Sequence, residues 1–156
     1  MKFFSPTRGP MTFDEMFADL SGFIHAAPED AYKLIVGTDS QLKDETCFVT
    51  AVIIHRLGKG ARFYYTKKRQ PKVTSLRQRI FYEASLSLSL AGRLAEHLAR
   101  NGHAGLDVEI HLDVGQQGET RDLIREVVGM ITGSGFDAKI KPESYGASKV
   151  ADKYTK

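Results

Sequence analysis

The chain contains the stretch Lys33-Leu34-Ile35-Val36-Gly37-Thr38-Asp39-Ser40-Gln41, in which an apolar run reaches a glycine and a carboxylate follows among small polar residues. Such a run predicts a buried strand over 33–39. Asp39 would then stand at the C-terminal end of that strand. Because a carboxylate without a cation partner is costly to remove from water, we expect Asp39 to belong to a site.

The residues before this strand, 1–31, are predicted to form an N-terminal extension with one covering helix. The first eleven residues include two prolines and a glycine and are expected to be irregular. Thr12 and Glu15 match a capping box. Apolar side chains follow them at helical spacing, so the pattern predicts a helix over 13–26.

Three strands in succession are predicted, over 33–39, 47–56 and 61–67. The second is apolar and β-branched almost throughout, which is typical of a strand covered on both faces. Glycines at 58 and 60 provide a turn before the third strand. Because both connections are short, we expect an antiparallel meander.

The second half of the chain alternates helices with strands. Apolar residues three and four positions apart indicate helices, and strict alternation of apolar and polar residues indicates strands. The predicted elements are, in order, a helix over 75–101, a strand over 106–113, a helix over 120–132, a short strand over 136–141 and a last helix over 147–153.

The resulting order after the N-terminal helix is βββαβαβα. Helical crossovers between strands imply parallel pairing and right-handed connections. We therefore predict an α/β fold with a mixed five-stranded sheet flanked by helices, in a single domain spanning 1–156.

Composition sets broad limits on the class of protein. The chain has 156 residues and a formal net charge of +3, which permits an anionic partner without requiring one. Its single cysteine, Cys47, excludes an internal disulfide and suits a reducing compartment. No apolar stretch approaches the roughly 18 residues of a membrane span, and no signal peptide is visible. We expect a cytoplasmic protein with no membrane association.

Two carboxylates stand at the ends of predicted strands. Asp39 ends the first strand and Asp113 ends the fourth. In mixed α/β sheets, ligands sit beyond the C-terminal ends of parallel strands, so the two side chains would emerge together if these strands are neighbours. Adjacent carboxylates repel one another unless a cation lies between them. Hard oxygen ligands favour Mg²⁺ or Mn²⁺.

This order of elements, with acids at these places, resembles the ribonuclease H-like superfamily, whose enzymes carry four acids. Position by position, the resemblance implies Asp39 in the first strand, Glu83 on the long helix, Asp113 at the end of the fourth strand and Asp152 on a late helix. Glu96 is a less favoured rival to Glu83.

More narrowly, the chain is similar to uncharacterised bacterial ribonuclease H-like proteins of the YkuK type. The stretches that carry this likeness are 5–7, 34–41, 77–90 and 151–156.

The superfamily resemblance implies a nuclease that hydrolyses phosphodiester bonds in nucleic acid with two metal ions, Mg²⁺ or Mn²⁺. Asp39 would bridge both ions, Asp113 and Glu83 would hold one, and Asp152 would hold the other. RNA, DNA and their hybrids stay open as substrates, as does the oligomeric state. The alternative is a non-catalytic protein of the same fold that binds nucleic acid or another partner.

Each acid also has a purely structural interpretation. Asp39 would form an Asx-turn, Asp113 would continue the polar face of its strand, Glu83 would be a solvated helix residue, and Asp152 lies near a chain end.

A basic segment over 67–79 has two interpretations. It is either a solvated loop or a rim that contacts phosphates beside the metal site. Its predicted nucleic-acid-binding residues are Lys67, Lys68, Arg69, Lys72, Arg77 and Arg79.

Overall fold

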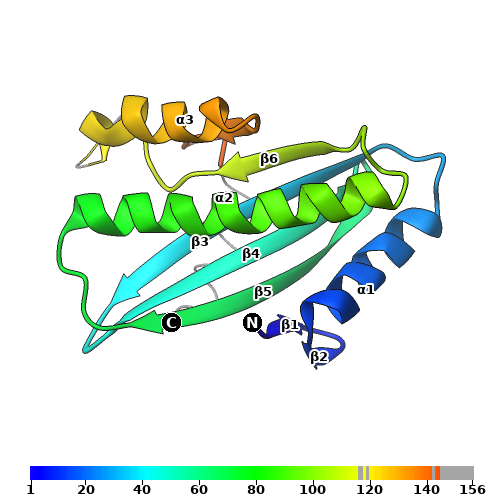
Figure 1. Ribbon diagram of the computed structural model, residues 1–156, viewed down its shortest axis with the longest axis horizontal. Coiled ribbons are helices and arrows are strands. Elements are labelled where there is room, and N and C mark those ends of the chain that lie inside the picture. Colours follow the sequence, from blue (N-terminus) through cyan, green and yellow to red (C-terminus); the bar gives the residue numbers. More distant parts are fainter. Residues whose placement is uncertain (116–117, 119, 142, 145–156) are drawn as a thin grey trace.

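The computed structural model describes residues 1–115, 118, 120–141 and 143–144. The strands are β1 (Phe3–Ser5), β2 (Gly9–Met11), β3 (Tyr32–Leu42), β4 (Thr46–Arg56), β5 (Gly60–Gln70), β6 (Asp107–His111) and β7 (Asp137–Lys139). The helices are α1 (Phe13–His25), α2 (Leu76–Arg100) and α3 (Ile124–Gly133), the last preceded by a 3-10 turn over Arg121–Leu123. Figure 1 shows α2 crossing in front of the sheet, with α1 and α3 on either side of it.

The strands form one mixed sheet in the order β2-β1-β5-β4-β3-β6-β7. The predicted antiparallel meander is confirmed, since β4 pairs antiparallel with both β3 and β5. Parallel pairing is confirmed as well, because β6 lies parallel to β3 and β7 lies parallel to β6.

The predicted count of five strands is wrong, because the described residues form seven. The two additional strands, β1 and β2, make a short antiparallel hairpin in the region expected to be irregular. Pro10 lies in β2, the outermost strand, where a missing N–H removes no ladder hydrogen bond. The predicted helix over 147–153 lies outside the described residues.

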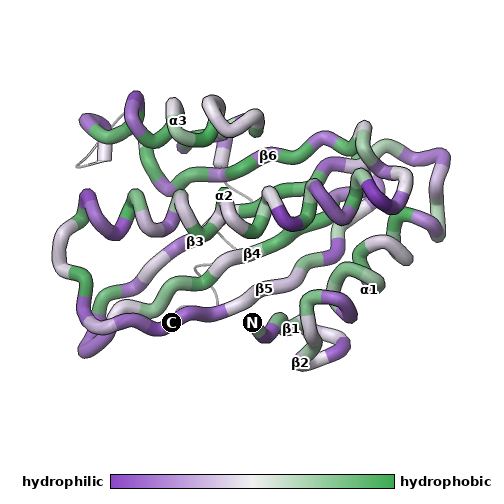
Figure 2. Tube along the Cα trace, in the orientation of Figure 1, coloured by the Kyte–Doolittle hydropathy of each residue, from purple (hydrophilic) through white to green (hydrophobic). Residues whose placement is uncertain are grey.

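One face of the sheet carries the main hydrophobic core. Leu34 and Val36 of β3 are fully buried there, in a cluster that includes apolar side chains of all three helices. Ile35, between them, belongs to a smaller cluster with Ile53 on the opposite face. Figure 2 shows the hydrophobic segments along the middle of the sheet and the helices. No helix in the described part of the chain is long and apolar enough to cross a membrane.

The N-terminal helix begins as its sequence predicts. The backbone N–H of Glu15 donates to the hydroxyl of Thr12 at 3.1 Å, and the N–H of Thr12 donates to the Glu15 carboxylate at 2.9 Å. This reciprocal cap satisfies two N–H groups that would otherwise lack partners at the start of α1.

Candidate metal centre

The pairing of β3 with β6 brings two acids to the same end of these neighbouring strands. The parallel register runs from Lys33 opposite Asp107 to Gly37 opposite His111. Asp39 and Asp113 each come two residues after the last β3–β6 pair. The prediction that Asp39 ends its strand is wrong, because β3 continues to Leu42 and Asp39 still pairs with Val49 of β4. The condition under which the two side chains would emerge together, that these strands are parallel neighbours, is met.

Hydroxyl groups attach α2 to β3 beside these acids. The Thr38 hydroxyl lies 2.7 Å from the Ser87 hydroxyl, and the Ser40 hydroxyl donates to the carboxylate of Glu83. From Thr38 to Ser40 the strand advances about 6.6 Å, and from Ser87 back to Glu83 the helix covers about 6 Å. The two contacts therefore match in spacing when α2 runs antiparallel to β3. This match places Glu83 over β3 at Ser40, next to Asp39.

Three of the four predicted acids converge in space. Asp39, Glu83 and Asp113 each offer a carboxylate oxygen, and these oxygens all lie within 4.8 Å of one another. Glu83 is 6% exposed, whereas Asp39 and Asp113 are half-buried. Asp152 lies outside the described residues. A set of oxygen ligands of this kind suits a hard divalent cation such as Mg²⁺ or Mn²⁺.

The environment of Glu83 favours its protonated form. Burial raises the pKa of Glu83 well above its usual value, and the charges of Asp39 and Asp113 raise it further, against the hydrogen bond from Ser40 and the charge of Arg79. A cation shared by the three acids would reverse this preference. Binding of such a cation would then be accompanied by loss of the Glu83 proton.

Comparison with known proteins identifies the family. The family model described as ribonuclease H-like matches residues 15–156. The chain belongs to the ribonuclease H-like family. It is also 37% identical over 166 aligned residues to the "Uncharacterized protein YkuK" of Bacillus subtilis (strain 168), an alignment covering 99% of this chain and 96% of that protein. Both findings confirm the resemblance seen in the sequence.

In this ribonuclease H-like protein a lysine lies against the acidic cluster, and the sequence-based prediction missed it. The Lys141 ammonium lies 2.7 Å from Oδ1 of Asp113. The hydrogen bond to Asp113 raises the pKa of Lys141 against the effect of burial, and the charges of Asp113, Asp39 and Glu83 raise it further. No sequence pattern indicated this contact, because Lys141 follows the last β6–β7 pair, His111 with Lys139, by two residues.

The polar face predicted for β6 is only partly solvated. Glu109 and His111 are buried at 5% and 7% exposure. Glu109 lies 3.0 Å from the Lys33 ammonium and 3.1 Å from His111 Nε2. Although burial acts in the opposite direction, these two partners hold the pKa of Glu109 below its usual value. Burial lowers the pKa of His111, so this histidine serves as a neutral partner of Glu109.

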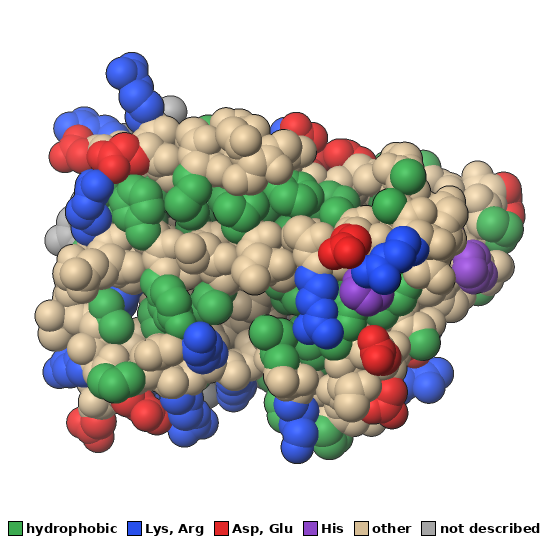
Figure 3. Space-filling model, viewed as in Figure 1, with side chains coloured by type: hydrophobic (Ala, Val, Ile, Leu, Met, Phe, Trp, Pro, Cys, Tyr) green, Lys and Arg blue, Asp and Glu red, His purple; other side chains and the backbone are tan. Residues whose placement is uncertain are grey.

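The six predicted nucleic-acid-binding residues do not lie on a single loop. Lys67, Lys68 and Arg69 belong to β5, so they lie on a strand and not in a loop, and their side chains are exposed to solvent. As neighbours in a strand, Lys67 and Lys68 point to opposite faces of the sheet. In Figure 3 the basic side chains along the lower left edge are separated by other surface.

The other predicted basic residues differ in whether their charges pair with acidic side chains. Lys72 is exposed in the connection between β5 and α2. Arg77 on α2 pairs with Glu126 at 2.6 Å, and Arg69 lies 3.4 Å from Glu45. Arg79, one turn before Glu83, contributes positive charge near that carboxyl group.

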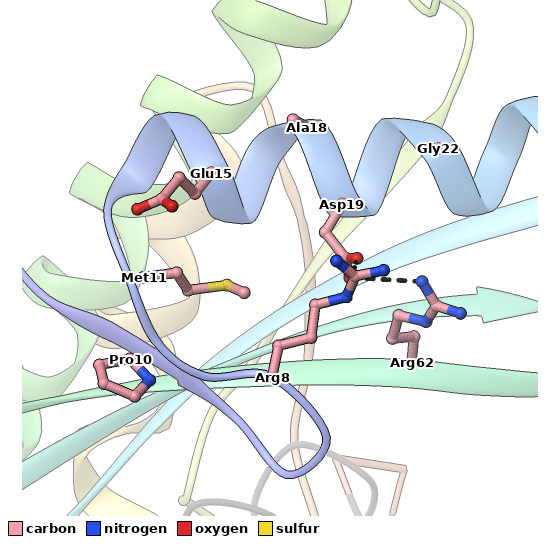
Figure 4. Close-up of a pocket in the computed structure, with 8 residues that line it drawn as sticks. All are labelled: Arg8, Pro10, Met11, Glu15, Ala18, Asp19, Gly22 and Arg62. Atoms are coloured by element: carbon pink, nitrogen blue, oxygen red, sulfur yellow. Dashed lines mark hydrogen bonds and ion pairs between the residues drawn. The ribbon is translucent and has the colours of Figure 1, made fainter.

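A separate cavity of about 780 Å³ lies between α1 and the β1–β2 hairpin. Arg8 and Arg62 line it, and both pair with Asp19 on α1, at 2.9 Å and 3.3 Å (Figure 4). The hydroxyl of the buried Tyr64 also donates to Asp19. With Glu15 included, the formal charges of this lining cancel. We interpret these contacts as a structural link between α1, the hairpin and β5, and place the candidate function at the acidic cluster.

Proposed function

We propose that this protein is a divalent-metal-dependent nuclease that hydrolyses phosphodiester bonds in nucleic acid. One observation carries the proposal: three carboxylates from β3, α2 and the end of β6 converge within 4.8 Å in a chain of the ribonuclease H-like family. Acids so close to one another are costly to maintain unless they share a cation.

Asp39, Glu83 and Asp113 would hold Mg²⁺ or Mn²⁺, and Asp152 would complete a site for a second ion. Bound ions of this kind lower the pKa of a water molecule and stabilise the charge of a leaving oxygen. The protein's own groups prepare the ligands. The Ser40 hydroxyl orients Glu83, and Asp113 is held on one oxygen by Lys141, which leaves its other oxygen for the cation.

The substrate side of the site is built from basic residues near the end of β5 and the start of α2. Lys67, Lys68 and Lys72 are exposed, and they suit contacts with phosphate oxygens. Such contacts position a strand without reading its bases, so the proposal covers RNA, DNA and hybrid substrates.

The test is a cleavage assay with labelled RNA, DNA, hybrid and junction substrates, in Mg²⁺, in Mn²⁺ and in EDTA. We expect metal-dependent cleavage of at least one substrate by the wild-type protein, and none by the Asp39→Asn variant, which keeps the side-chain shape and removes the charge. Binding to these substrates with no cleavage in any metal would instead support the non-catalytic alternative.

A further inference from the structure

Lys141 places a positive charge directly against the acidic cluster. Its Nζ lies 2.7 Å from Oδ1 of Asp113, a distance typical of a charge-assisted hydrogen bond. The four acids implied by the family resemblance include no cation of this kind. The question is what a lysine does where a metal is expected.

The position of Lys141 is set by backbone contacts rather than by its flexible side chain. Two backbone hydrogen bonds hold the chain around Lys141 although β7 ends at Lys139: the N–H of Leu112 donates to the Lys139 carbonyl, and the N–H of Lys141 donates to the Val114 carbonyl, both at 2.8 Å. If residue 115 had a Cβ atom, that atom would lie 3.2 Å from Cβ of Lys141, which is tighter than most such contacts in proteins. The chain thus holds Lys141 against the segment that carries Asp113.

Charge balance suggests the role of this lysine. The described cluster carries at most three negative charges, the third only when Glu83 is ionised, and Lys141 supplies one positive charge. We propose that Lys141 is a resident counter-ion, which holds Asp113 in place before a metal binds and limits how tightly the cluster then binds a divalent cation. This inference rests on the proposed function, because it assumes that the acids bind a metal.

The mechanism is electrostatic in both states. Without metal, the ammonium offsets repulsion among the carboxylates, which stabilises their convergence. With metal, the same ammonium repels the incoming cation. In water, the repulsion between the lysine ammonium and a divalent cation about 6 Å away weakens binding of that cation about tenfold. Lys141 is 56% exposed, so the dielectric constant of water is the appropriate one.

The experiment measures Mn²⁺ binding to the full-length protein by electron paramagnetic resonance of the free ion. Lys141→Met is expected to bind Mn²⁺ about tenfold more tightly than wild type. In EDTA its Tm should be lower than that of wild type, and saturating Mn²⁺ should raise its Tm by more than it raises the Tm of wild type. Lys141→Arg keeps the charge and should retain wild-type affinity. Lys59→Met removes an equal charge beside Asp30, at the end of the sheet where β3 begins, and should not change affinity.

The outcomes separate this inference from the proposed function. Unchanged or weaker Mn²⁺ binding by Lys141→Met, with normal binding by wild type, would overturn the counter-ion role alone. A wild-type protein that binds no Mn²⁺ would overturn the proposed function and this inference with it. Lys141→Gln, a second neutral variant, should reproduce the result of Lys141→Met.

Discussion

Replacing Glu83 with glutamine is expected to stabilise the metal-free protein at neutral and alkaline pH. The pKa of Glu83 is raised by burial and by Asp39 and Asp113, so the folded state binds this proton more tightly than the unfolded state does. The resulting stability is fully present below the unfolded pKa and is lost as pH rises through the folded pKa. Glutamine has no charge and can still accept the hydrogen bond from Ser40. The variant should therefore not lose stability as the pH rises through the folded pKa of Glu83.

The separation of the acids gives the size of the effect. Two unit charges 4.8 Å apart repel by about 1 kcal/mol at the dielectric constant of water and by about 3.5 kcal/mol at an effective value of 20. Glu83 is buried and its neighbours are half-buried, so we expect Glu83→Gln to gain about 2 kcal/mol at pH 8. For a chain of 156 residues this corresponds to about 4–8 °C in Tm. At pH 4 the two proteins should unfold alike.

The assay is thermal unfolding followed by circular dichroism in EDTA from pH 4 to 9. The difference in Tm between Glu83→Gln and wild type should grow with pH, and saturating Mn²⁺ should reduce or reverse it. Glu96→Gln is the matched control, because Glu96 lies on the same helix in an exposed pair with Arg100 and should change stability by only a few tenths of a kcal/mol. A pH-independent difference, or a less stable Glu83→Gln at pH 8, would refute the electrostatic argument.

Three further outcomes are expected. Thr38→Val should destabilise the protein by about 1–3 kcal/mol in denaturant titrations, because two buried hydroxyl partners lose their contact; no loss would show that these bonds do not hold α2. Asp19→Asn should lower stability by about 1–3 kcal/mol without changing Mn²⁺ affinity, and an altered affinity would contradict its structural role. Replacing Lys67 and Lys68 together with glutamine should reduce the slope of log affinity for nucleic acid against log salt by about 1.4–1.8, whereas an unchanged slope would remove both from the interface.

The convergence of Asp39 and Asp113 was predictable because strand patterns carry it. An apolar run that reaches Asp39 and an alternating run that reaches Asp113 identify two strands. The antiparallel meander followed by a helical crossover predicts that these strands run in the same direction, and the structure shows that they are also neighbours. Parallel neighbours then bring their C-terminal ends to one edge. Each step uses local sequence and a general rule of topology.

The burial of Glu83 was not predictable in the same way. Apolar spacing identifies the buried stripe of a helix, but Glu83 flanks that stripe, and its solvated alternative was equally consistent with the sequence. Its 6% exposure depends on how α2 is rotated over β3, which the hydroxyl contacts of Thr38 and Ser40 help to determine. Contacts between segments more than 40 residues apart leave no periodic signal.

Short elements and exact register were also beyond the sequence patterns. The β1–β2 hairpin has strands of three residues each, too short to show alternation, and a proline concealed one of them. The contact of Lys141 with Asp113 depends on the register of β7 against β6.

The central claim is that Asp39, Glu83 and Asp113 share a divalent cation. Anomalous diffraction at the manganese edge from a crystal soaked in Mn²⁺ tests it most directly, and it would also show where Asp152 lies. We predict a strong peak with carboxylate oxygens of all three residues at coordination distance, about 2.0–2.3 Å. No manganese peak at the cluster, with the three carboxylates held only by protein contacts, would contradict the account.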